Sequence, residues 1–279
     1  MVNIRSWADA DYDGLVASMR VLGFDLDNTL ACSKQPMHAA MADRITRLTR
    51  LIPVAIITGG RYELVVSQIL DVLGKGANRA NLHLMPTSGT RYYRWNGTDW
   101  ACVYEHELSE EDKRRAIDSL RRHAEEQGVW NEPSWGPRIE DRGSQITFSA
   151  LGQLAPAEAK ERWDPGDAKK MRLAAAVAAD LPHLKVRPGG YTSIDVSAPG
   201  LDKAYAVRAL ADRLGVEPSR IVFVGDRMNP GGNDYPAAQA GAAALSVTGP
   251  GDTLRLCDEL LDRLERQADP AGHTGRDGS

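Results

Sequence analysis

Short apolar runs alternate with amphipathic segments over the first 89 residues. The runs at 21–24, 53–57 and 82–85 are mostly apolar, as in strands buried on both faces of a parallel sheet. Apolar residues at helical spacing between and after these runs predict helices over 37–51 and 62–73. This order of strand and helix predicts a parallel α/β sheet.

The pattern changes near Gly89. An aromatic stretch around Asn96-Gly97 predicts a β-hairpin over 91–100. The segments that follow are predicted as a charged helix at 109–127, a strand at 138–150, an alanine-rich helix at 169–179 and a strand at 193–196. Because this pattern, which starts with a hairpin, differs from that of the flanking parts, the segment is predicted to be an inserted α+β domain.

The strict alternation returns in the last third of the chain. We predict a helix at 203–214, strands at 221–224 and 243–247, and an amphipathic helix whose apolar residues run from 254 to 264. The residues after Gln267 are predicted to be a solvated tail. The fold class is therefore α/β: a parallel Rossmann-like core at 1–89 and 199–279, interrupted by an α+β domain at 90–198.

Composition narrows the function. The 279 residues are 42% hydrophobic and 26% charged with a net charge of -4, which argues against disorder and against a nucleic-acid partner. The three cysteines are far apart, which argues against disulfides or zinc and favours a reducing compartment. Neither a signal-like start nor a membrane-length apolar run is present, so the sequence predicts a cytoplasmic protein without membrane contact.

Polar residues follow three of the predicted strands. Asp25 and Asp27 come after the first, Thr58 after the second and Asp226 after the strand at 221–224. Ligands of open α/β sheets lie beyond the carboxyl ends of strands, so these residues are expected to meet at one edge. Two aspartates separated by one residue can divide nucleophilic attack and proton transfer between them. The pair alone is a weak signal.

Four segments in a fixed order make the signal specific. They are FDLDNT at 24–29, IITGG at 56–60, GLDKAY at 200–205 and VFVGDRMNPGGND at 222–234. This set resembles the four motifs of the haloacid dehalogenase-like superfamily. The last segment, together with RGSQITFS at 142–149 and TSIDV at 192–196, resembles the eukaryotic-type phosphomannomutase family. That resemblance implies a type IIB arrangement, in which the inserted domain is a cap that reads the substrate.

The resemblance also implies roles for the core residues. Asp25 would be the nucleophile and a Mg²⁺ ligand, and Asp27 the acid/base, whose main-chain carbonyl also binds the metal. Asp226 would supply another ligand, while Asn233 and Asp234 would orient the water ligands of the metal. Mg²⁺ prefers such oxygen ligands and neutralises phosphate, so that a carboxylate can approach it.

The remaining roles concern a phosphorylated sugar as substrate. Thr58 and Gly59 would bind a phosphoryl oxygen, and Lys203 would pair with both the phosphoryl group and Asp25. In the cap, the positions that resemble the sugar-phosphate contacts of the family are Arg142, Gln153, Lys160, Ser193 and Asp195. Relatives with this cap often dimerise through it, so the resemblance implies a homodimer.

The chain departs from the family at three positions. Gln153 and Lys160 occupy positions where the family uses arginine, and neither replaces the bidentate fork of a guanidinium. This favours a sugar-phosphate phosphatase, with a phosphomannomutase-like isomerase as the alternative and a non-catalytic sugar-phosphate-binding protein as the third. Asn28 replaces the usual glycine of the first motif, which we expect to be silent because asparagine tolerates left-handed backbone.

Overall fold

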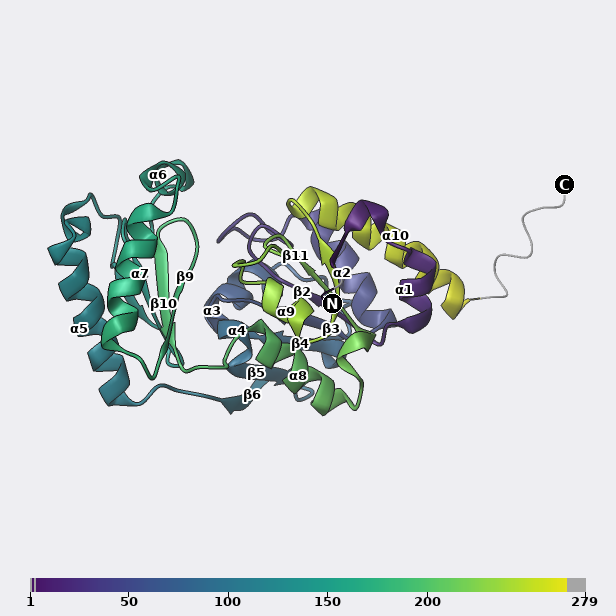
Figure 1. Cartoon of the computed structure of the whole chain (residues 1–279). Helices are drawn as coiled ribbons and strands as arrows, with labels where there is room; N and C mark the ends of the chain where they lie inside the picture. Colours follow the sequence, from purple (N-terminus) through teal and green to yellow (C-terminus); the bar gives the residue numbers. More distant parts are fainter. Residues whose placement is uncertain (1, 3, 270–279) are drawn as a thin grey trace, which may run out of the picture. The chain divides into compact units, whose positions relative to one another are not determined.

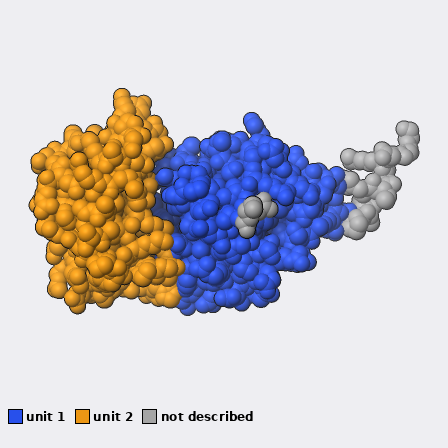
Figure 2. Space-filling model, viewed as in Figure 1, with its two compact units in different colours: residues 1–104, 202–279 blue, residues 105–201 orange. Residues whose placement is uncertain are grey.

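The computed structural model describes residue 2 and residues 4–269, drawn in Figure 1. Contacts divide the chain into two compact units, coloured in Figure 2: a core unit, residues up to Tyr104 and from Asp202 onward, and an inserted unit, Glu105–Leu201. The insertion therefore begins at Glu105 instead of residue 90, because the aromatic hairpin adds two strands to the sheet of the core unit.

The core unit is built on one sheet in the order β1-β12-β11-β2-β3-β4-β5-β6. Its strands are β1 (Ile4–Ser6), β2 (Val21–Phe24), β3 (Val54–Ile57), β4 (Leu82–Met85), β5 (Arg91–Trp95), β6 (Trp100–Glu105), β11 (Ile221–Gly225) and β12 (Ala243–Ser246). In this spatial order, each strand from β1 through β4 is parallel to its neighbour, and β5 is antiparallel to β4. Because β2 lies between β11 and β3, the three strands that precede the candidate residues end side by side.

Successive side chains of each strand pack on opposite faces of this sheet. In β2, Leu22 and Phe24 belong to the core that α1, α2 and α10 cover, whereas Val21 belongs to the core beneath α8 and α9. The helices are α1 (Tyr12–Ser18), α2 (Ala39–Leu51), α8 (Lys203–Leu214), α9 (Tyr235–Gln239) and α10 (Pro250–Ala268). The core unit is thus a three-layer α/β/α structure, as the alternating pattern predicts (Figure 1).

The inserted unit has its own antiparallel sheet, in the order β7-β8-β10-β9, and its own core. Its elements are α5 (Glu110–Glu126), β7 (Ile139–Asp141), β8 (Gln145–Ser149), α6 (Ala157–Trp163), α7 (Ala168–Asp180), β9 (Lys185–Pro188) and β10 (Ser193–Ser197). The single strand predicted over 138–150 was wrong. Gly143, at φ 80°, lies in the turn that splits this stretch into β7 and β8.

Other differences lie in the core unit. The helix predicted over 62–73 begins as α3 (Tyr62–Val65) and continues as the π-helical turn η2 (Val66–Leu70). The strand β1 and the helix α1 were not predicted. Most of the predicted tail, residues 270–279, lies outside the described residues. Among the helices of the described part, none has the length and hydropathy that a membrane crossing requires.

The turn after β4 brings two backbones very close. Gly89, in α4 (Pro86–Gly89), has φ +82°, and an added Cβ would lie 2.4 Å from Cβ of Ala206 in α8. Gly97 in the hairpin has a similar φ, +107°, but open space around it. An alanine would have a strained backbone at either position. Only at Gly89 would its Cβ also clash with another residue.

We therefore expect Gly97→Ala to cost about 1–2 kcal/mol of unfolding free energy, the usual cost of left-handed backbone. Gly89→Ala should lower the unfolding free energy by about 1–3 kcal/mol more than Gly97→Ala does, because α8 has to move to relieve the overlap. Urea denaturation of both variants measures the difference. Equal losses would mean that the contact with α8 is easily relieved.

Candidate active site

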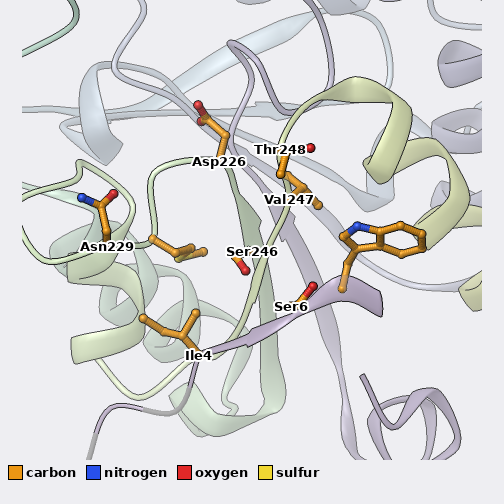
Figure 3. A pocket seen from close by; sticks show the side chains of 9 residues that line it. Ile4, Ser6, Asp226, Asn229, Ser246, Val247 and Thr248 are labelled. Atoms are coloured by element: carbon orange, nitrogen blue, oxygen red, sulfur yellow. The ribbon is translucent and has the colours of Figure 1, made fainter. Parts of the chain in front are cut away.

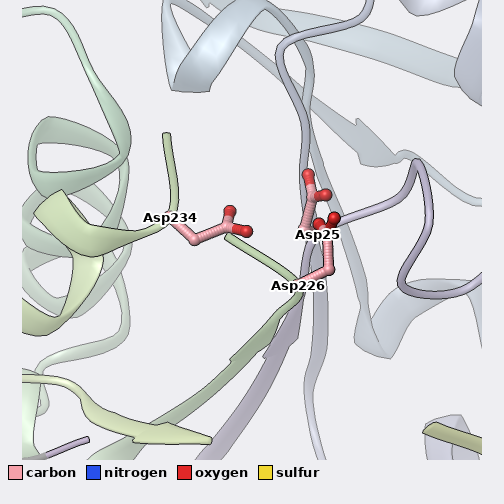
Figure 4. A group of neighbouring side chains, drawn as sticks. All are labelled: Asp25, Asp226 and Asp234. Atoms are coloured by element: carbon pink, nitrogen blue, oxygen red, sulfur yellow. The ribbon is translucent and has the colours of Figure 1, made fainter. Parts of the chain in front are cut away.

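Three carboxylates converge at the carboxyl edge of the core sheet. Asp25 follows β2 and is 4% exposed, Asp226 follows β11, and Asp234 precedes α9. Each contributes an oxygen within 4.8 Å of the other two. Figure 4 shows the carboxylates of Asp25 and Asp226 next to each other, with that of Asp234 pointing towards them from a separate loop.

A buried lysine holds this cluster together. Lys203 opens α8, is 1% exposed, and places Nζ 2.5 Å from Oδ1 of both Asp25 and Asp234. Burial lowers the pKa of Lys203, but the two carboxylates outweigh burial and leave that pKa above its ordinary value. The ammonium group is therefore charged and paired with the predicted nucleophile, which is the contact that the family resemblance implies.

One ammonium group does not compensate three carboxylates. Burial, opposed by Lys203 and reinforced by Asp234, raises the pKa of Asp25 from 3.8 to about 8. Burial and the charge of Asp234 raise the pKa of Asp226 to about 6. A further positive charge at this place would reverse both shifts.

The donor set fits a magnesium ion. Both oxygens of Asp234 already accept hydrogen bonds, Oδ1 from Lys203 and Oδ2 from the main-chain N–H of Arg227 at 2.9 Å. Oδ2 of Asp25 accepts none from the described residues, and Oδ1 of Asp226 accepts only a long one from Thr29, at 3.4 Å. Asp25 and Asp226 are thus the carboxylates available to a cation, and hard oxygen ligands are those that Mg²⁺ prefers.

Asn233 adds independent support for a ligand near this loop. Its Oδ1 is buried and has no hydrogen-bond partner among the described residues. A buried amide oxygen without a partner costs about 1–3 kcal/mol, which a bound cation or its water would remove. The role of Asn233 in orienting such water stays a prediction.

The loop that carries Asp234 requires glycine. At Gly225, the end of β11, an added Cβ would lie 2.5 Å from Cγ of Asp234. At Gly232 it would lie 2.0 Å from the carbonyl oxygen of Arg227. These contacts explain why the last motif is rich in glycine: the loop folds back until Asp234 reaches Lys203.

The first motif is arranged around Asp27. Its Oδ1 accepts hydrogen bonds from the N–H of Lys34 at 2.7 Å and from Nε2 of Gln68 at 3.2 Å. Asn28 has φ 58°, which confirms that the position needs left-handed backbone. Gln68 and Thr29 were missed in the sequence, because a buried glutamine in a predicted helix and a threonine after the two aspartates carry no distinctive signal.

The second motif forms a braced loop. Oγ1 of Thr58 accepts from the N–H of Gly60 at 3.0 Å, and the carbonyl of Thr58 accepts from the N–H of Ser88 at 2.7 Å. An added Cβ at Gly59 would meet no atom within 4 Å. The loop therefore leaves space beside Thr58, and phosphoryl binding there stays a prediction.

The candidate residues of the inserted unit lie in β10, between β7 and β8, and between the end of β8 and the end of α6. Ser193 and Asp195 share one face of β10, and Oδ1 of Asp195 accepts from Thr147 of β8 at 2.8 Å. Gln153 and Lys160 contact each other through Nζ of Lys160 and the carbonyl oxygen of Gln153, at 3.3 Å. Arg142 forms a half-buried ion pair with Glu140, at 2.7 Å. Their contacts with substrate stay predictions.

A shallow pocket extends from Asp226 along the ends of β12 and β1 (Figure 3). It is lined by Ile4, Ser6, Trp7, Asp226, Met228, Asn229, Ser246, Val247 and Thr248. None of these nine side chains is cationic.

A parallel core sheet with an inserted domain, and a buried aspartate paired with a lysine beside further carboxylates, define the haloacid dehalogenase-like superfamily. The family model for eukaryotic phosphomannomutase matches residues 41–263, which is most of the chain. The chain therefore belongs to the eukaryotic phosphomannomutase family.

Curated relatives agree with this assignment. The chain is 27% identical to a phosphomannomutase from Spinacia oleracea, covering 85% of this chain and 94% of that protein. It is 24% identical to phosphomannomutase 1 from Homo sapiens, covering 85% and 90%.

Solved structures share the fold at lower identity. A Plasmodium falciparum IMP-nucleotidase mutant with bound IMP has TM-score 0.67 at 16% identity, covering 90% of this chain and 69% of that one. A haloacid dehalogenase-like hydrolase from Bacteroides thetaiotaomicron has TM-score 0.59 at 14% identity, covering 89% and 99%.

The raised pKa values of Asp25 and Asp226 predict how metal and pH act on stability. The folded protein holds these two protons more tightly than the unfolded chain, so metal-free protein should lose stability as pH rises from about 4 to about 8. Mg²⁺ competes with those protons and should therefore raise the melting temperature more at about pH 8 than at about pH 6. Thermal melts with and without Mg²⁺ at both pH values measure this. A Mg²⁺ effect that does not change with pH would contradict it.

Gly225→Ala should displace Asp234, because the added Cβ overlaps its carboxyl group. We expect a loss of about 1–3 kcal/mol in unfolding free energy and a smaller Mg²⁺-induced shift in melting temperature. Gly251→Ala in α10 is the matched control, since its Cβ would meet nothing within 4 Å. A Gly225→Ala protein with wild-type melting behaviour would show that Asp234 does not need its observed place.

Proposed function

We propose that this chain is a phosphohexomutase, which moves a phosphoryl group between carbon 1 and carbon 6 of a hexose through a phosphorylated Asp25. The observation that carries the proposal is the buried Asp25, paired with Lys203 beside Asp226, in a member of the phosphomannomutase family. The sequence alone favours a phosphatase. The names of the relatives support the isomerase alternative better than hydrolysis.

In the proposed reaction, the 6-hydroxyl of a hexose 1-phosphate attacks the phosphorus of phosphorylated Asp25. The hydroxyl proton passes to Asp27, and the bond between phosphorus and the Asp25 oxygen breaks. The resulting bisphosphate turns round, and Asp25 attacks the phosphorus on carbon 1. Asp27 then returns the proton to the departing oxygen, which leaves hexose 6-phosphate and phosphorylated Asp25.

The surrounding residues would stabilise the charge of both transfers. Lys203 and Thr58 would bind equatorial oxygens of the phosphoryl group. A magnesium ion held by Asp25 and Asp226 would neutralise phosphate charge. The inserted unit would act as the cap and bind the sugar through Arg142, Ser193 and Asp195. Cytoplasmic location and dimerisation through this unit remain predictions from the sequence.

Hydrolysis is the second candidate, and an observation in the inserted unit favours it. A mutase also holds the phosphate that is not reacting, which calls for cationic side chains. Here Arg142 is paired with Glu140, and the other two positions carry Gln153 and Lys160. With water instead of a sugar hydroxyl as the attacking group, the same Asp25 chemistry gives a phosphatase.

The test is an assay with mannose 1-phosphate and glucose 1-phosphate in Mg²⁺, with and without the hexose bisphosphate as activator. Free phosphate and hexose 6-phosphate are measured together. We expect activator-dependent 6-phosphate, and we expect Asp25→Asn to lower the rate by about 10³-fold or more while the protein stays folded. Asp71→Asn, which changes an exposed aspartate, is the matched control.

Free phosphate without isomer would replace the mutase proposal with the phosphatase. Neither product, together with saturable binding of the sugar phosphate, would make the chain a binding protein. Full activity in Asp25→Asn would contradict both enzymatic proposals.

A further inference from the structure

Gln68 is a buried polar side chain that none of the four motifs contains. It is 1% exposed and lies in the π-helical turn η2, whose wider hydrogen bond runs from the N–H of Asp71 to the carbonyl of Val66 at 2.9 Å. A π-helical turn re-aims the side chains that follow it, and such turns are frequent at functional sites. Gln68 is aimed at Asp27.

The orientation of the Gln68 amide is fixed by its partners. Nε2 donates to the carbonyl oxygen of Gln35 at 3.0 Å and to Oδ1 of Asp27 at 3.2 Å. The main-chain carbonyl oxygen of Gln68 in turn accepts from the N–H of Met37 at 2.9 Å, which fixes the backbone at this residue. Since a main-chain carbonyl can only accept, the amide cannot turn over without losing its bond to Gln35.

Two donors act on the same oxygen of Asp27. Nε2 of Gln68 and the N–H of Lys34 both donate to Oδ1, whereas Oδ2 accepts no hydrogen bond from the described residues. One oxygen of the carboxylate is thus anchored, and the other is left for proton exchange. A carboxylate held at one oxygen cannot rotate freely away from a substrate oxygen.

The fit of Gln68 is poor for a residue that only fills the core. Its Oε1 is buried and has no hydrogen-bond partner among the described residues. A methionine of similar length would fill the same space without a buried acceptor. The presence of an amide at this position is therefore better explained by the hydrogen bond that it donates to Asp27.

We propose that Gln68 is a positioning residue for the acid/base, holding the Asp27 carboxylate where Oδ2 exchanges its proton with the hydroxyl or leaving oxygen of the sugar phosphate. This inference rests on the proposed function, in which Asp27 is that acid/base. Gln68 itself does not touch the reacting atoms. Its effect on the rate passes through Asp27.

The test is a double-mutant cycle on the full chain, with hexose 1-phosphate as substrate. Gln68→Met removes the donor and is expected to lower kcat by about tenfold with KM changed less than about twofold. In the Asp27→Asn background, Gln68→Met should change kcat by less than about twofold, because no proton donor is left to position. Ile69→Val, a buried change in the same turn, is the control for a structural effect and should leave kcat unchanged.

A second variant covers the case in which Gln68→Met does not fold. Gln68→Glu keeps the size but places a carboxylate against Asp27, and it should lower kcat more than Gln68→Met does. Equal loss of kcat in both backgrounds, or no loss from either Gln68 variant, would overturn the inference. If Asp27→Asn itself left kcat unchanged, the acid/base role in the proposed function would fail instead.

Discussion

The pairing of Lys203 with Asp25 and Asp234 is the interaction on which the site depends. It joins the end of β2, the start of α8 and the loop before α9, which are far apart in the sequence. Burying a carboxylate is costly unless a positive charge compensates it. Removing the ammonium group would leave the buried carboxylates of Asp25 and Asp234 without an ion-pair partner. The same shortage of positive charge suits the cluster to a cation, and a bound cation would in turn neutralise the charge of a phosphoryl group.

The sheet provides the framework for this pairing. Because β2 lies between β11 and β3, their carboxyl ends deliver Asp25, Asp226 and Thr58 to one edge without long connections. Asp234 does not follow a strand and reaches the site through a loop. That loop can fold close to β11 because Gly225 has no side chain to overlap the Asp234 carboxyl group. The candidate catalytic residues thus lie next to regular strands and helices of the core unit, while the candidate sugar-binding residues lie in the inserted unit.

The fold itself is shared by proteins with different names, including a nucleotidase and a hydrolase of similar structure. What is common to them is a scaffold, so the choice between transfer to a sugar and transfer to water is made by particular residues. Under the proposed function, that choice would depend on the cationic and polar side chains of the inserted unit, where Arg142 forms an ion pair with Glu140.

The sequence by itself determined the fold class, most strands and helices of the core except β1 and α1, and the three strand ends that carry Asp25, Thr58 and Asp226. These features are predictable because apolar runs and the polar residues after them are local patterns. It did not determine where the insertion begins. The sequence of the hairpin at 91–105 is compatible with either unit, and only the pairing of β5 with β4 assigns the hairpin to the core sheet. Only the tertiary structure decided that Asp234 shares Lys203 with Asp25 and that Gln68 reaches Asp27. Those contacts depend on a glycine-permitted loop and a π-helical turn, which bring together residues whose spacing in the chain carries no signal.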